Sequence, residues 1–245
     1  MRALLLGALA AAASLAGCDA TDSFSTGGGG DCEELVWEGS VDIHDEDGLA
    51  ILEGYTEITG DLEISNSPVP RLDPLHCLGK VGGSVSIVSN SALTSAAGLE
   101  NLAHIGGGLS LGSCGSLTTF RLDLLEHLGG AFAVSSNGSL ESLGAATLPT
   151  IGDRLAMEDN PFLESVDLGA VQGISSFATI DGNTRLQEID LHSIDSIGGV
   201  LWISSNPQLP TCAATEIRDQ LAELPGGACI EGNLADECED DPSGC

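Results

Sequence analysis

ITGDLEISNSP, residues 58–68, is the stretch that decides the fold, because it returns along the chain at a constant interval. The counterparts of its first residue, Ile58, are Val81, Ile105, Leu128, Ile151, Ile174 and Ile197. Successive starts lie 23 residues apart, except for one interval of 24. A period of this length indicates a solenoid, in which each repeat forms one coil and buries its apolar face only against neighbouring coils.

Each repeat contains two apolar positions separated by one variable residue. The apolar positions are Leu62/Ile64, Val85/Ile87, Leu109/Leu111, Phe132/Val134, Leu155/Met157, Ala178/Ile180 and Leu201/Ile203. A period of two predicts a short strand with these residues facing the core. The residues between them face outward and form the candidate recognition face, which comprises Glu63, Ser86, Ser110, Ala133, Ala156, Thr179 and Trp202.

A polar residue follows each strand. It comes nine residues after the start of the repeat, and one residue earlier in the first repeat. The series is Asn66, Asn90, Cys114, Asn137, Asn160, Asn183 and Asn206. Asparagine accepts the left-handed backbone conformation, and its amide can bond backbone groups in a corner. We therefore expect an internal ladder with these residues as rungs, in which Cys114 is a free structural thiol.

The array is expected to end in caps. Residues 37–43 fit the frame as a degenerate first coil. Near the other end Ala213, Ile217, Leu221 and Leu224 share one helical face, which predicts a capping helix within residues 211–224. We assign residues 32–230 to a mostly β solenoid of about seven 23-residue coils, and residues 231–245 to an acidic, cysteine-containing tail.

The N-terminus has the features of an export signal. Residues 1–17 carry a basic start, a short apolar run and small residues, as secretory signals do. Residues 15–18, LAGC, resemble a bacterial lipobox, which implies cleavage before Cys18 and its lipidation; the alternative is an ordinary signal peptide with a chance cysteine. Several acyl chains would hold the protein firmly on a membrane. Residues 18–31 would then form a lipidated, glycine-rich linker.

Charge and cysteine content limit the function classes. The 245-residue chain has a formal net charge of -30, which argues against nucleic acid or anionic lipid headgroups as partners. Of its eight cysteines, Cys212 and Cys229 flank the expected helix and are a candidate disulfide. Neither Cys-x-x-Cys nor zinc-type Cys/His spacing occurs, so we expect neither a metal site nor a cofactor.

Residues 52–64, LEGYTEITGDLEI, resemble the receptor L domain. The shared features are Gly54 and Tyr55 before the Ile58 strand, together with the repeated frame up to Ile203. The resemblance covers roughly residues 34–229. It implies a right-handed, single-stranded β-helix without catalytic residues, and a role in recognition.

Two further patterns have scaffold interpretations. Residues 42–48, DIHDEDG, look like a calcium loop, but Ile43 stands where the first carboxylate ligand is required, so an acidic surface turn is expected. His104 and His127 lie one repeat apart and should stack in adjacent coils. A metal site there is the alternative to a corner of the scaffold, which we favour.

The sequence thus favours a non-enzymatic protein of the bacterial envelope, lipid-anchored in the outer membrane, on its periplasmic face or at the cell surface. Its β-helix would present a surface to an envelope or extracellular protein or a glycan. One alternative is a carbohydrate-active β-helix enzyme, which would require acidic side chains of adjacent coils to converge in a groove. A second alternative is a structural spacer of the envelope.

Overall fold

The computed structural model describes residues 32–238, 240 and 245. The expected signal peptide, the lipidation site Cys18 and the linker lie outside these residues. Within the described part, no helix is both long enough and apolar enough to cross a bilayer.

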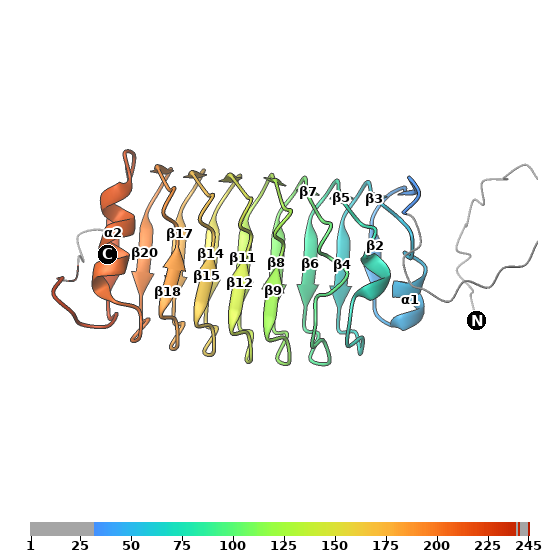
Figure 1. Ribbon diagram of the computed structural model, residues 1–245, viewed down its shortest axis with the longest axis horizontal. Helices are drawn as coiled ribbons and strands as arrows, with labels where there is room; N and C mark the ends of the chain where they lie inside the picture. The colour runs from blue at the N-terminus through green and yellow to red at the C-terminus, as the bar shows by residue number, and fades with distance from the viewer. Residues whose placement is uncertain (1–31, 239, 241–244) are drawn as a thin grey trace, which may run out of the picture. The chain divides into compact units, whose positions relative to one another are not determined.

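The protein is a β-solenoid built around one sheet of nine parallel strands (Figure 1). The sheet follows chain order: β2 (Val41–Ile43), β4 (Leu62–Ser65), β6 (Val85–Val88), β8 (Leu109–Gly112), β11 (Phe132–Ser135), β14 (Leu155–Glu158), β17 (Ala178–Asp181), β20 (Leu201–Ser204) and β21 (Ala228–Glu231). Seven of these strands are the predicted repeats. The first, β2, is the expected degenerate coil, while β21 adds a coil that the period does not reveal.

Short parallel strands form the other sides of the coils. One sheet contains β1 (Val36–Trp37), β3 (Glu57–Ile58), β5 (Lys80–Val81), β7 (His104–Ile105) and β10 (His127–Leu128), and another contains β13 (Thr150–Ile151), β16 (Gly173–Ile174) and β19 (Ser196–Ile197). A four-stranded sheet contains β9 (Thr119–Arg121), β12 (Ser142–Gly144), β15 (Ser165–Asp167) and β18 (Glu188–Asp190). The first coils carry instead the helix α1 (Glu46–Ala50) and the 3-10 turn η1 (Asp73–Leu75).

The core runs through all coils, as the alternation predicts. Every predicted inward residue of the seven strands is buried, including Phe132 and Met157. Full burial of such a side chain contributes roughly 1.5–3 kcal/mol. Close stacking of the coils also leaves no room for a side chain at Gly106, because a Cβ there would collide with the carbonyl oxygen of Gly82 in the preceding coil.

The asparagine ladder is present, with one corrected rung. Asn160 is typical: its Nδ2 donates to the carbonyl of Val134 at 3.1 Å, and its own backbone N–H donates to Oδ1 of Asn183 at 3.1 Å. Cys114 is buried and free, and its backbone N–H donates to Oδ1 of Asn137 at 3.0 Å. Burial raises the pKa of its thiol, which keeps it protonated.

The assignment of Asn66 to the ladder is wrong. Ser67 is the buried rung, and its backbone N–H donates to Oδ1 of Asn90 at 2.9 Å. Asn66 is exposed and adopts φ 51°, the left-handed corner that Ser89 and Ser136 occupy in later coils. The nine-residue spacing therefore holds in the first repeat too. The residue before the rung adopts the left-handed conformation, whereas the prediction gave this conformation to the asparagine rungs themselves.

The C-terminal cap differs from the expected one at its boundary. Helix α2 (Thr211–Gln220) ends before Leu221, which is extended. The chain then returns beside the preceding coil, where the N–H of Ala222 donates to the carbonyl of Asp195 at 2.8 Å. Beyond β21, Asn233 adds a ladder rung by donating to the carbonyl of Ile203 at 2.9 Å. The solenoid therefore extends past residue 230.

The predicted pairing of Cys212 with Cys229 is also wrong. Cys212 is bonded to Cys238, and Cys229 to Cys245. Cys229 belongs to β21, whereas Cys212 lies in the first turn of α2. The backbone N–H of Cys212 donates to the Asp236 carboxylate at 2.9 Å, and this contact brings the chain around Cys238 to the helix.

Candidate functional site

The outer face of the nine-stranded sheet carries the predicted recognition residues in one straight column. The strands pair in register, so that each residue stands beside its counterpart in the next coil. The column is Glu63, Ser86, Ser110, Ala133, Ala156, Thr179 and Trp202. All seven residues are exposed or half-buried. The structure thus brings together the side chains that the sequence placed on one face.

The character of this column changes along the solenoid. Its N-terminal end is acidic, since Asp42 of β2 stands beside Glu63. Its middle consists of serine and alanine. Its C-terminal end is aromatic, since its last residue is Trp202, which is 36% exposed.

A hollow of about 360 Å³ lies at the aromatic end, lined by Phe177, Thr179, Gly199, Val200 and Trp202. Phe177 is 41% exposed and comes from the coil before Trp202. Phe177 is not among the site residues predicted from the sequence. It stands two residues before Thr179, and because side chains alternate along a strand it shares the outward face. The same alternation rule could have found it.

Polar groups lie beside the indole of Trp202, toward the strand ends and outside the lining of this hollow. The Trp202 Nε1–H donates to Oγ of Ser204 at 2.5 Å, and that hydroxyl donates to Oδ1 of Asp181. Glu158, Asp181 and Ser204 stand in register in adjacent strands. The rim beside the indole is therefore acidic, and the orientation of the indole is fixed by a hydrogen bond.

A second hollow, of about 420 Å³, lies on the side of the four-stranded sheet. Its lining includes Asp167, Asp190 and His192. The two aspartates are paired neighbours in β15 and β18. Acidic side chains of adjacent coils thus meet in one hollow, which is the arrangement that an enzyme of this fold would require.

The charged groups in this hollow have partners. Arg121 donates to Asp167 at 2.8 Å and also bonds Asp123, and these carboxylates raise the pKa of the guanidinium. His192 Nδ1 lies 2.6 Å from Oδ1 of Asp190. Burial alone would raise the pKa of Asp190, but hydrogen bonds from the ring and backbone of His192 bring it below its ordinary value.

His104 and His127 stack as predicted, with ring centroids 4.3 Å apart and planes 9° from parallel. Imidazole nitrogens bind metals in the plane of the ring, so two parallel rings do not converge on one ion. Burial, His127 and Lys80 lower the pKa of His104. The geometry agrees with a corner of the scaffold. The acidic stretch at residues 42–48 leads from β2 into α1, and Asp45 caps this helix by accepting the N–H of Gly48 at 2.8 Å.

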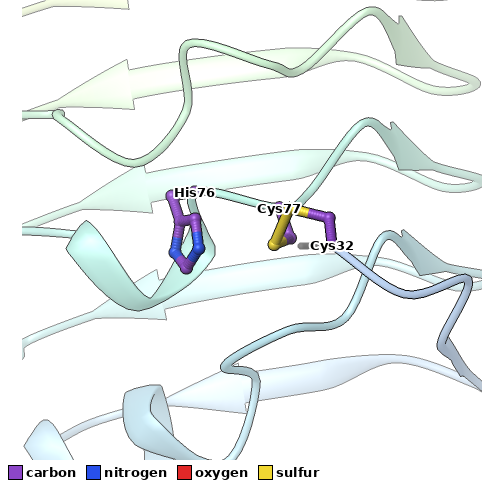
Figure 2. A group of neighbouring side chains, drawn as sticks. All are labelled: Cys32, His76 and Cys77. Carbon is purple, nitrogen blue, oxygen red and sulfur yellow. A yellow bond between two sulfur atoms is a disulfide. The ribbon is translucent and has the colours of Figure 1, made fainter. Parts of the chain in front are cut away.

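Three groups in the described residues have metal-like composition, and each contains a disulfide. Figure 2 shows one of them, in which His76 lies beside the Cys32–Cys77 bond. The other two are Cys212, Asp236 and Cys238, and Cys229, Glu231 and Cys245. Metal binding by cysteine requires the thiolate. While these bonds are intact, their sulfurs offer none.

No family model matches the chain, and no curated protein matches its sequence. The site must therefore be interpreted from its own geometry.

Proposed function

We propose that the chain is a non-enzymatic, lipid-anchored protein of the bacterial envelope that uses the outer face of its nine-stranded sheet for recognition. Cys18 would carry the lipid, and residues 18–31 would separate the solenoid from the membrane. The partner would be an envelope or extracellular protein or a glycan. The resemblance to the receptor L domain supports the same kind of role.

The observation that carries this proposal is the straight outward column that ends at an exposed tryptophan. Trp202 and Phe177 are large apolar side chains left accessible at the end of a column whose middle consists of serine and alanine. Exposed aromatic residues are enriched where proteins bind partners. The acidic charge further restricts the partner, because strong negative charge repels nucleic acid and other polyanions.

Site-specific crosslinking in cells that make the protein tests this role. A photo-reactive residue at Ser110 would probe the sheet face, and one at Thr119 would serve as the control, since Thr119 is exposed on the four-stranded sheet. We expect adducts from position 110 and none from position 119. Adducts from neither position would contradict the recognition role and favour the spacer.

A second candidate, a carbohydrate-active enzyme, is favoured by the hollow that contains Asp167, Asp190 and His192. Paired carboxylates can act as general acid and base in glycoside cleavage. Release of reducing ends from polysaccharides, abolished by Asp167→Asn and Asp190→Asn, would establish this activity. Glu188→Gln is the matched control, because it changes an exposed acid on the same strand as Asp190.

A further inference from the structure

We infer that the hollow between Phe177 and Trp202 binds a neutral glycan by stacking a pyranose ring on these aromatic side chains. This inference rests on the proposed recognition function and names the chemical class of its ligand. It places the binding site at one end of the column rather than over the whole sheet.

The spacing of the two rings suits a flat ligand. Thr179 and Trp202 are paired neighbours in β17 and β20, and parallel strands lie about 4.8 Å apart. Phe177 directly precedes β17, which contains Thr179, and the buried Ala178 lies between them. The two aromatic side chains therefore flank the hollow diagonally, with Thr179 in its lining. A sugar ring has apolar C–H faces that pack on aromatic rings, and hydroxyls that a threonine side chain can bond.

The indole of Trp202 is held in place before any ligand arrives. Its only hydrogen-bond donor is already bonded to Ser204, whose hydroxyl is bonded in turn to Asp181. The ring face remains partly exposed, with 36% of the residue accessible. A fixed side chain loses little conformational entropy on binding, so stacking on this ring retains more of its free energy.

The charge around the hollow selects among glycans. Asp181 lies beside Trp202, to which it is connected through Ser204, and Glu158 and Glu231 stand in the same register row of neighbouring strands. Carboxylates accept hydrogen bonds from sugar hydroxyls but repel uronate, sulfate and phosphate groups. A hydrocarbon ligand could donate no hydrogen bond to these carboxylates. A neutral sugar satisfies both the apolar rings and the acidic rim.

The rest of the column gives a linear glycan room to continue. The residues that precede Thr179 in register are Ala156, Ala133 and Ser110, whose side chains are small. An extended chain can follow these positions without meeting a bulky side chain. In the other direction Cys229, next to Trp202 in register, is buried and disulfide-bonded. We therefore expect an oligosaccharide to run from Trp202 toward the N-terminal coils.

Tryptophan fluorescence can test this directly. In a Trp37→Phe background, Trp202 is the remaining tryptophan, so its emission reports on the hollow. The protein would be titrated with cellohexaose, laminarihexaose, mannohexaose and hexa-N-acetylchitohexaose, with oligogalacturonate as the anionic comparison. We expect at least one neutral hexasaccharide to shift the emission, and oligogalacturonate to leave it unchanged.

Calorimetry with variants locates the binding. Trp202→Ala and Phe177→Ala should each weaken the affinity for that hexasaccharide at least tenfold. Phe162→Ala is the matched control and should bind as the wild type does. Phe162 is exposed to a similar degree, at 40%, but packs under Arg185 on a corner away from the column. Circular dichroism would verify that each variant is folded.

The outcomes separate this inference from the proposed function. If the glycan binds equally well to the Trp202 and Phe177 variants, or if no neutral hexasaccharide binds while position 110 crosslinks to a protein, the inference fails and the recognition role stands. A loss of self-association in Trp202→Ala, measured by sedimentation, would assign the hollow to a second copy of the chain and also overturn the inference. If crosslinking and titration are both negative, both proposals fail.

Discussion

Replacing Asn160 by leucine should destabilise the solenoid strongly, because this one buried side chain bonds two backbone groups of the preceding coil. Oδ1 of Asn160 accepts the backbone N–H of Asn137 at 3.1 Å, and its Nδ2 donates to the carbonyl of Val134 at 3.1 Å. Asn160→Leu removes both partners without admitting water, since the site is fully buried. A buried group left without a partner costs about 1–3 kcal/mol, so the two together cost about 2–6 kcal/mol.

Denaturant unfolding followed by circular dichroism would measure this loss, and hydrogen exchange at the amide of Asn137 would show whether its bond is broken. Asn66→Ser is the matched control, because Ser89 and Ser136 hold the same left-handed corner. We expect this control to change the free energy of unfolding by less than about 0.5 kcal/mol. An unchanged unfolding midpoint in Asn160→Leu, or an equal loss in Asn66→Ser, would refute the ladder as described.

Four other predictions concern the cysteines and a histidine. Cys114 should resist alkylation in the native protein, because it is buried and its pKa is raised, and labelling without denaturant would contradict this. A disulfide-linked peptide pair containing Cys212 and Cys238 should appear in a non-reducing digest. Cys18→Ala should release the protein from membranes and remove the mass of the lipid; an unchanged location would exclude the anchor. The lowered pKa of His104 means that the unfolded chain binds a proton there more readily, so stability should fall as the pH drops below 6.5. His104→Phe should reduce this loss, and an identical pH profile would show that His104 is not its source.

Residues of the repeated frame could be predicted because seven copies establish its period. The inward positions, the outward column and the stacking of His104 on His127 all follow from a 23-residue period. Predictions fail where a feature occurs only once or where a repeat departs from the regular pattern. Asn66 was assigned by residue type, although the constant spacing pointed to Ser67. The period does not predict the ninth coil, because helix α2 lies between this coil and the regular array.

The sequence by itself determined the β-solenoid, the faces of its strands and the ladder that runs through it. A period is a local pattern repeated, and stacking identical units requires only that each coil fits the next. The tertiary structure alone decided which unrepeated groups meet: Cys212 with Cys238, Cys229 with Cys245, and Phe177 with Trp202. Such contacts depend on how far each side chain projects and which coil it faces. They occur once, so no periodic signal in the sequence announces them.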